Sequence, residues 1–272
     1  MYEYIILIIG GVFSGLLTSL FGLGGSLTTV PTLLIALPLL SIEKNEITHV
    51  AIATSLAIMF VNSILSMKSH HSSGNIRWDI FKSSILFIIL GTFAGTYIAM
   101  KLDSKKLLLF YLFFVFFIII RFLRSEFIQK KETKNSEHLK VSWRKKTFYE
   151  IITGIISACV GGGSSLVMVP FYKHQGFKMK EASALAVSFN VIIAFFATIN
   201  YMFINQLSEP IAKFSTGYIY WPAFLFLLLG SFVGVPIGVK LANKLSEKFQ
   251  TVFYFLFIVV VFILMTLKYL KA

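Results

Sequence analysis

Apolar residues fill long runs along most of the chain, and short polar gaps separate these runs. A helix needs about 20 mostly apolar residues to cross a bilayer core. Runs of this length lie at 47–67, 80–100, 105–123, 182–204, 218–239 and 249–267. Two further apolar stretches, 4–40 and 147–174, contain glycine clusters and a proline. The pattern predicts an all-α integral membrane protein. Its first helix should be retained, because the N-terminus lacks the basic leader and cleavage site of a signal peptide.

One polar gap is longer than the others and strongly basic. Residues 121–148 hold nine Lys and Arg residues against three Glu residues. This gap divides the chain into a first membrane repeat at 1–124, a basic cytoplasmic linker at 125–146 and a second membrane repeat at 147–272. The linker fits either a lipid-headgroup or regulatory patch, or a cytoplasmic loop that follows the positive-inside rule. We favour the loop, because basic cytoplasmic loops are the general pattern in membrane proteins.

The two halves align with each other, which indicates an internal duplication. The segment GLLTSLFGLGGSLTTVP, from Gly15 to Pro31, matches GIISACVGGGSSLVMVP, from Gly154 to Pro170, at seven of seventeen positions. Three more landmarks follow in the same order in both halves. They are Ala51-x-Ala53-x-Ser55 with Ala184-x-Ala186-x-Ser188, Gly74-x-Ile76-x-Trp78 with Gly217-x-Ile219-x-Trp221, and the row Gly91, Gly95, Ala99 with the row Gly230, Gly234, Gly238. Duplicated membrane halves are typical of transporters.

Each glycine-rich stretch is too long for one crossing and is expected to fold as a helix–turn–helix hairpin. Residues 4–40 would form a helix of roughly 55 Å, against a hydrocarbon core about 30 Å thick. Glycine costs about 1 kcal/mol inside a helix, so the glycines are placed at the apex. The second return arm, 164–175, is short and should stop partway through the membrane. A hairpin ends on the side where it began. Each half, a hairpin plus three spans, therefore crosses an odd number of times, and the repeats are inverted.

The composition and the charges agree with this arrangement. The chain is 57% apolar and 14% charged, with a net charge of +13 and one cysteine. These values exclude a soluble globular domain, a nucleic-acid-binding domain and a disulfide scaffold. With the linker inside, inverted repeats place 18 basic residues inside and seven outside, whereas parallel repeats give 15 and ten. Because basic residues accumulate on the cytoplasmic side, the inverted arrangement with both termini outside is favoured.

The paired glycine-rich segments, each followed by A-x-A-x-S, G-x-I-x-W and G-xxx-G, resemble the sulfite exporter TauE/SafE family of membrane transporters. The resemblance covers residues 8–104 and 150–246. It implies transport, with export expected, of small sulfur-containing anions such as sulfite, thiosulfate or organosulfonates. Leu23 stands where the second half has Gly162, and Gly25 stands where it has Ser164. The two apices are therefore not chemically equivalent.

The apices of the two hairpins are the expected substrate site. No Lys or Arg lies in the middle of an apolar run, so other groups must attract an anion. Where a helix restarts after a break, its first N–H groups lack helical partners and its dipole is positive, which favours a small anion. The residues expected to bind substrate there are Gly22, Gly24, Gly25, Ser26, Thr28, Gly161, Gly162, Gly163, Ser164 and Ser165. The alternative is that the glycines only let the two arms of each hairpin pack closely.

Polar residues in the span after each hairpin form a second candidate set. The residues expected to line the substrate pathway are Ser55, Asn62, Ser188 and Asn190. Ser and Thr in membranes also bond to their own helix or to a neighbouring one, and we favour this interpretation for Ser66 and Thr198. The rows that begin at Gly91 and Gly230 are expected to be packing faces where the halves meet.

The remaining chemistry argues against an enzyme. No nucleophile–base pair and no metal-ligating cluster is visible, so no catalytic residue, metal or cofactor is expected. The ATP-binding motif G-x-x-x-x-G-K-[ST] is absent, so the protein should not be a pump on its own. The acidic residues nearest to an apolar run are Asp79, Glu150 and Glu181, at span entrances, and no carboxylate proton relay is visible. For coupling, two options stay open: a substrate that carries its own proton, and simple equilibration of the anion.

The expected location is the cell membrane, as a multi-pass protein that works by secondary transport. Its expected partners are a small anionic substrate and the lipid bilayer, with no nucleic acid, and a homodimer stays open. The alternative function is transport of another small anion or of a cation on the same fold. A non-transporting scaffold or sensor that signals through the basic linker is a further alternative.

Overall fold

The computed structural model describes residues 2–21, 25–40, 42, 46–128, 143–177, 179–203, 212–244 and 247–271, and nearly all of them are helical. The helices are α1 (Tyr2–Phe21), α2 (Ser26–Ala36), α3 (Ile47–Ser72), α4 (Trp78–Lys101), α5 (Ser104–Ile128), α6 (Trp143–Val160), α7 (Ser165–His174), α8 (Met179–Phe203), α9 (Trp221–Lys244) and α10 (Glu247–Lys271). A short 3-10 turn (Leu37–Leu40) follows α2. The strands β1 (Ser215–Thr216) and β2 (Ile219–Tyr220) form a small antiparallel ribbon before α9.

The helices suit a membrane in length and in surface. Within the described residues, five stretches are long and apolar enough to cross it: Tyr2–Leu20, Ile47–Ser72, Trp78–Lys101, Glu181–Phe203 and Trp221–Gly238. Large apolar side chains such as Leu86, Phe113 and Leu225 are more than half exposed, which in a soluble protein would be an aggregation hazard. The outer surface therefore faces lipid, and the chain is a multi-pass, all-α membrane protein.

Each glycine-rich stretch forms two helices, as the sequence predicts. The first hairpin consists of α1 and α2, and the second consists of α6 and α7. The return arms α2 and α7 have 11 and 10 residues. At 1.5 Å per residue α7 is about 15 Å long, or roughly half the thickness of the hydrocarbon core. The first return arm is longer, because α2 passes directly into the 3-10 turn Leu37–Leu40. That the second arm stops partway through the membrane stays a prediction. The six expected spans are likewise helical, as α3, α4, α5, α8, α9 and α10.

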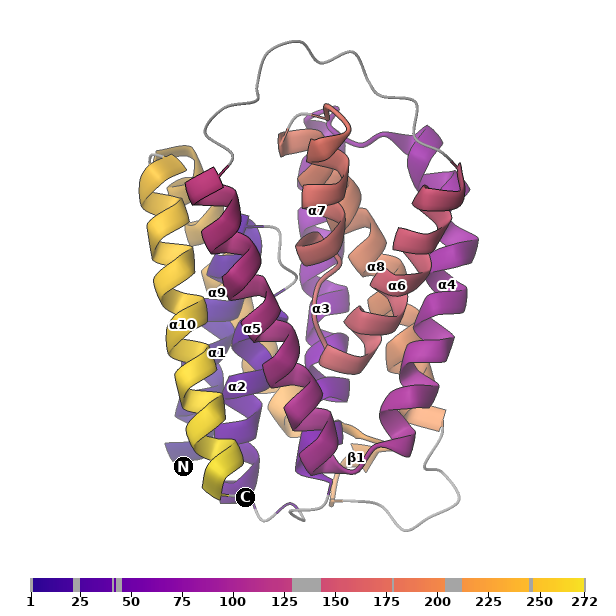
Figure 1. Ribbon diagram of the computed structural model, residues 1–272. Coiled ribbons are helices and arrows are strands. Elements are labelled where there is room, and N and C mark those ends of the chain that lie inside the picture. The colour runs from indigo at the N-terminus through magenta and orange to yellow at the C-terminus, as the bar shows by residue number, and fades with distance from the viewer. Residues whose placement is uncertain are drawn as a thin grey trace.

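The helices α3 and α8 pack against each other at the centre of the bundle (Figure 1). They are the most enclosed of the spanning helices: 67% and 61% of their apolar windows are buried, against 33–39% for the other three. Because both faces of α3 and α8 are covered, their small and polar side chains can meet inside the protein. The candidate residues Ser55, Asn62, Ser188 and Asn190 all lie on these two helices.

The helices around this centre pair across the two halves of the chain. The closest partners are α1 with α9 and α4 with α6, and α5 packs against α10. Glycines allow the first two pairs to approach. A Cβ built on Gly95 of α4 would lie 2.5 Å from the carbonyl oxygen of Ile155 in α6, and one on Gly234 of α9 would lie 2.0 Å from that of Val12 in α1. The glycine rows are therefore packing faces between the halves, as expected.

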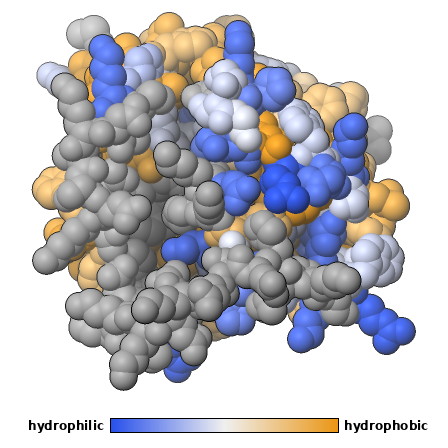
Figure 2. All heavy atoms as spheres, turned by 90° about the horizontal axis from the view of Figure 1, so that it is seen from above, coloured by the Kyte–Doolittle hydropathy of each residue, from blue (hydrophilic) through white to orange (hydrophobic). Residues whose placement is uncertain are grey.

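The two hairpins open at opposite ends of the bundle. In Figure 1 both chain termini lie at the lower end, where the α1–α2 hairpin opens, while the α6–α7 hairpin opens at the upper end, where α5 finishes. Basic residues at the upper end include Lys68, Arg77, Arg144, Lys145, Lys146 and Lys173. Seen from above in Figure 2, hydrophilic side chains gather over this end. The positive-inside rule predicts that this end is the cytoplasmic one.

Candidate functional site

The apex of the second hairpin lies against helices of the first half. Gly161 has a φ of +67°, a left-handed conformation that a side chain rarely adopts. A Cβ there would lie 2.6 Å from the hydroxyl oxygen of Ser55 on α3 and 3.2 Å from Val30 on α2. The contact explains the need for glycine, and it brings Gly161 together with Ser55. Gly162 and Gly163 continue this buried turn.

A side chain of α8 holds the point where the second hairpin restarts. The backbone N–H of Ser164 donates to Oδ1 of Asn190 at 2.5 Å, and the Ser164 hydroxyl donates to the carbonyl of Ala186 at 2.7 Å. Ser164 and Asn190 are fully buried, and Ser165, the first residue of α7, is almost fully buried. One of the open N–H groups at the start of α7 is thus taken by an amide oxygen.

The side-chain amide of Asn190 has one unpaired group, its NH2, which is a hydrogen-bond donor. A backbone N–H can only donate, so the atom that it contacts must be the amide oxygen, and the NH2 group lies on the other side. Nδ2 of Asn190 is buried and has no hydrogen-bond partner among the residues that the structure describes. The Asn62 amide lies 2.5 Å from the Ser231 hydroxyl. A hydroxyl can both donate and accept, so this contact does not fix which end of the amide is unpaired. The buried donor available to an acceptor is therefore Nδ2 of Asn190.

Three hydroxyl groups of the candidate set are directed to the backbone in this conformation. Ser55 donates to Ile52 at 2.9 Å, Ser188 donates to Ala184 at 2.8 Å, and Thr28 donates to Gly25 at 2.9 Å. Bonds of this kind within a helix are common for Ser and Thr in membranes. The protons of these hydroxyls are therefore not offered to a ligand, whereas their buried oxygens still shape the site.

The first hairpin restarts at Gly25, which has a φ of +80°. Its carbonyl accepts hydrogen bonds from the N–H groups of Thr28 and Thr29, both at 3.0 Å, and a Cβ would lie 2.3 Å from the Ser14 hydroxyl. Gly22, Gly24 and the side chain of Ser26 lie outside the described residues. The expectation that both apices form the substrate site therefore stays a prediction.

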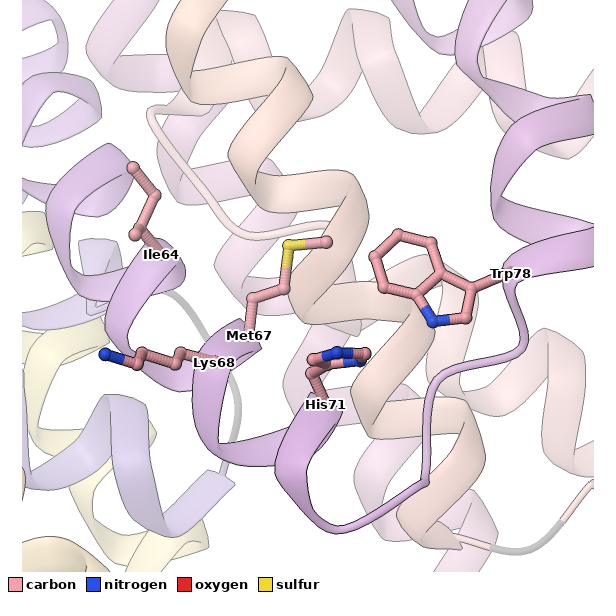
Figure 3. Close-up of a pocket in the computed structure, with 5 residues that line it drawn as sticks. All are labelled: Ile64, Met67, Lys68, His71 and Trp78. Carbon is pink, nitrogen blue, oxygen red and sulfur yellow. The ribbon is translucent and has the colours of Figure 1, made fainter.

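A cleft of about 280 Å³ opens at the upper end of the bundle, away from the apices (Figure 3). It is lined by Ile64, Met67, Lys68 and His71 of α3 and by Trp78 of α4. Figure 3 shows Met67 and Trp78 pointing toward each other, while Lys68 points away. A second groove, of about 430 Å³, runs between α1, α2 and α10; it includes Thr28 and is mostly apolar. Neither space is lined by the unpaired amides of Asn62 and Asn190.

The sequence places Glu150 at a span entrance but does not show that it is buried. Its side chain is 1% exposed, with Lys146 as an ion-pair partner at 3.5 Å. The signal was present as a Lys-to-Glu spacing of four residues, which places both side chains on one helix face. Hydropathy along the chain cannot show that α4 and α7 cover that face. Among the described residues, no group of three His, Cys, Asp or Glu side chains could hold a metal ion.

Comparisons with known proteins agree with this architecture. A family model described as "Sulfite exporter TauE/SafE" matches residues 7–265. A probable membrane transporter protein of Haemophilus influenzae is 27% identical over 234 residues, which cover 85% of this chain and 86% of the relative. A probable membrane transporter protein of Methanocaldococcus jannaschii is 26% identical over 236 residues, covering 85% and 81%. The probable membrane transporter protein YunE of Bacillus subtilis is 22% identical over 254 residues. No solved structure matches.

Proposed function

The chain belongs to the sulfite exporter TauE/SafE family of membrane transporters, and we propose that it exports small sulfur-containing anions such as sulfite, thiosulfate or organosulfonates. The transport cycle would be alternating access around the paired helix breaks. The alternative cargo is another small anion or a cation on the same fold. The proposal names the cargo and the mechanism, whereas the relatives carry only the name of probable membrane transporters.

The observation that carries the proposal is the unpaired amide of Asn190. An anion only accepts hydrogen bonds, and a buried N–H donor without a partner costs about 1–3 kcal/mol. A bound anion removes this cost, and the positive end of α7 adds to the attraction. A cation site would instead need unpaired oxygens, but the amide oxygen of Asn190 already accepts the N–H of Ser164. The donor set therefore favours an anion over a cation.

Inverted repeats would supply the two-sided access that such a cycle needs, and the helix contacts support them. If the halves are repeats, α1 corresponds to α6, α3 to α8 and α4 to α9. The contact between α1 and α9 then has its counterpart in the contact between α6 and α4, and the contact between α4 and α8 has its counterpart in the contact between α9 and α3. Individual contacts match as well. A Cβ on Gly15 meets the backbone of Ser231 and Val235, while one on Gly154 meets that of Ile88 and Thr92.

These contacts give the glycine rows a register different from the one read from the sequence. Gly91 meets Ile151 and Gly234 meets Val12, so Gly91 corresponds to Gly234 rather than to Gly230. In the same way, Gly95 corresponds to Gly238. The alignment of the two rows therefore shifts by one helical turn. In the shifted alignment Gly91 and Gly234 are separated along the chain by the same number of residues as Trp78 and Trp221.

The substitution Asn190→Asp tests the anion site. The aspartate keeps an oxygen for the Ser164 N–H but replaces the unpaired donor with a negative oxygen. We expect affinity for sulfite or thiosulfate to fall at least tenfold, because a hydrogen bond to a charged group is worth about 1.5–3 kcal/mol. The measurement is a thermal shift of the purified protein with a panel of anions. Asn200→Asp is the matched control, since Asn200 lies on the same helix and donates to Thr96. Unchanged affinity in Asn190→Asp would remove this amide from the site.

Cysteine labelling tests the inverted arrangement. In a Cys159→Ala background, single cysteines replace Leu39, beyond the end of α2, and His174, at the end of α7. Both residues are exposed. We expect an impermeant maleimide to label one site from outside intact cells and the other only after permeabilisation. Labelling of both sites from the same side would support parallel repeats instead.

A further inference from the structure

The second hairpin contains a carboxylate that neither the fold nor the anion site uses. Glu150 has no exposed surface, although it lies only about 10 Å along α6 from Trp143, at 1.5 Å per residue. Within the described part of the chain, both carboxylate oxygens lack a hydrogen-bond partner. A buried ionisable group in a membrane protein is costly, and where one occurs it usually serves transport or proton movement.

Lys146 is the charged neighbour of Glu150. Its ammonium group lies 3.5 Å from Oε1 of Glu150 and also donates to the Ser83 hydroxyl on α4. The Lys146 side chain is 15% exposed, so the ammonium group can reach water while the carboxylate cannot. The ion pair therefore joins a buried proton acceptor, the Glu150 carboxylate, to a cation, the Lys146 ammonium group, at the mouth of the bundle, which is the end where α6 begins.

Two neutral polar groups complete the surroundings of Glu150. They are the hydroxyls of Ser84 on α4 and Tyr172 on α7, which both interact with the carboxylate. Ser84 already donates to the carbonyl of Ile80 at 2.7 Å, and the Tyr172 hydroxyl has no hydrogen-bond partner. The helices α3, α5 and α8 also contact α6, but among the described residues none of their charged side chains interacts with Glu150.

A purely structural role does not account for this cluster. An ion pair at a spacing of four residues stabilises a helix by only about 0.2–0.5 kcal/mol, while burying a charge costs several. In the register set by the glycine contacts, Gly11 stands in the first hairpin where Glu150 stands in the second. The partners Ser84 and Tyr172 correspond to Leu227 and Leu33. The same packing thus forms without any polar group in the other half.

We propose that Glu150 is the proton-binding group of the transport cycle and that Lys146 alternates between Glu150 and the transported anion; the proposal rests on the transport function proposed above. The proton comes from a hydronium ion at the upper end of the bundle: Lys146 passes one of its own protons to the carboxylate and regains one from the hydronium, which is left as water. The charge of Glu150 disappears and an O–H bond forms. The new O–H can donate to Tyr172 or Ser84, and Lys146 is released to attract an anion. Anion binding and proton binding then favour each other, so that the two move together, in the direction set by the combined gradients of the anion, the proton and the membrane potential; export follows where the outward anion gradient and the negative-inside potential prevail.

The cluster is placed to pass this change to the apex. Glu150 and Tyr172 lie on the two arms of the second hairpin, and Ser84 lies on the helix that packs against it. Ten residues of α6, about 15 Å of helix, separate Glu150 from the end of the helix at Val160. Lys146 therefore meets the anion at the upper end of the bundle, on its way to or from the apex, while protonation of Glu150 changes how the two arms are held.

The decisive experiment compares wild type with Glu150→Gln in proteoliposomes. Two quantities are measured with radiolabelled sulfite: exchange at equal pH on both sides, and accumulation driven by an inward proton gradient. We expect Glu150→Gln to keep exchange but to lose accumulation about tenfold, within the usual size of a coupling between two ligands. Glu181→Gln is the matched control, because Glu181 lies at the same end of the bundle, is about a quarter exposed and faces Arg77. It should behave as wild type.

The outcomes separate the two proposals. If wild type exchanges none of the anions tested, the transport proposal fails and the coupling proposal fails with it. If wild type exchanges sulfite but Glu150→Gln accumulates it equally well, the proton travels on the substrate as bisulfite, and only the coupling proposal fails.

Sulfite can itself carry a proton, as bisulfite, which would complicate the interpretation. Two further measurements avoid this complication. Thiosulfate stays fully ionised, so its affinity should rise on acidification in wild type and stay constant in Glu150→Gln. Infrared difference spectra between acidic and alkaline buffer should show the carbonyl band of a protonated carboxyl that Glu150→Gln lacks and Lys146→Gln shifts. Identical spectra for wild type and Glu150→Gln would overturn the assignment, whether or not transport is observed.

Discussion

The two hairpins have the same backbone arrangement but differ in the side chains at equivalent positions. In the first, Gly11 packs directly on the backbone of Leu227, and the position of Leu33 is apolar and fully buried. In the second, the corresponding positions hold Glu150, Ser84 and Tyr172. The restart points differ too: Gly25 is left-handed and bonded to its own arm, whereas Ser164 is helical and bonded to α8. The first hairpin is therefore held by packing, and the second by polar contacts that a proton or an anion can change.

The largest expected effect tests the frame that both hairpins share. Gly95→Leu on α4 and Gly234→Leu on α9 each place a side chain against a carbonyl oxygen of the facing helix. Overpacking typically costs about 1–3 kcal/mol when side chains can move, and here backbone would have to move. We expect both variants to yield little monodisperse protein in detergent. Ala94→Leu, beside Gly95 but exposed, is the control and should purify normally. Tolerance of only one of the two variants would break the equivalence of the α4–α6 and α1–α9 pairs.

The next effect concerns the polar filling of the second hairpin. Lys146→Met leaves the Glu150 carboxylate buried without its counter-charge, and breaking such a pair typically costs about 3–5 kcal/mol. Lys146→Met combined with Glu150→Leu makes this hairpin apolar like the first and should recover most of the loss. Apparent melting temperatures in detergent give the comparison, with exposed Lys145→Met as the control. A double variant as unstable as Lys146→Met would mean that the carboxylate itself contributes to stability.

A smaller effect separates the two restart points. Gly25→Ala forces a side chain into a left-handed conformation, which costs about 1–2 kcal/mol, and directs it at the Ser14 hydroxyl. Ser164→Ala loses one hydrogen bond, to Ala186, worth about 0.5–1.5 kcal/mol. We expect the lower melting temperature for Gly25→Ala. The reverse order would indicate that the second restart depends on its contact with α8 more than the first depends on its glycine.

The smallest expected effect is at Cys159, next to the second apex. Its thiol is buried and donates to the carbonyl of Gly95 at 3.1 Å. A thiol is a weak donor, so Cys159→Ala should cost less than about 1.5 kcal/mol and leave transport unchanged. Maleimide should not label Cys159 in the folded wild type. Rapid labelling would show that the second apex opens to water.

How much of this could be read from the sequence depended on the range of each interaction. The long apolar runs predicted the spans, and the glycine clusters predicted where α1 and α6 end, because both signals are local. The register of the glycine rows failed by one turn, since small residues spaced four apart fit equally well after a shift of four. Only contacts such as Gly95 with Ile155 resolve the choice.

The site was less predictable than the spans. The residue type and the helix of Asn190 were foreseen, but its bond to Ser164 joins residues 26 positions apart on different helices. Glu150 was judged by its distance from the middle of an apolar run, although its burial comes from α4 and α7. Donors that remain unpaired, and charges that are covered by other elements, are properties of the assembled bundle.

The pairing of α1 with α9 also constrains how the protein is made. The ribosome completes α1 first, yet the helix whose backbone Gly11 and Gly15 touch begins only at Trp221. The pair α4 and α6, in contrast, is available once residue 160 has been synthesised. During most of translation α1 must therefore lie in the lipid, or bind another protein transiently, while its small-residue face is not yet covered by α9. Truncations that end before α9 should leave this first helix without its closest partner and make it a target for membrane quality control.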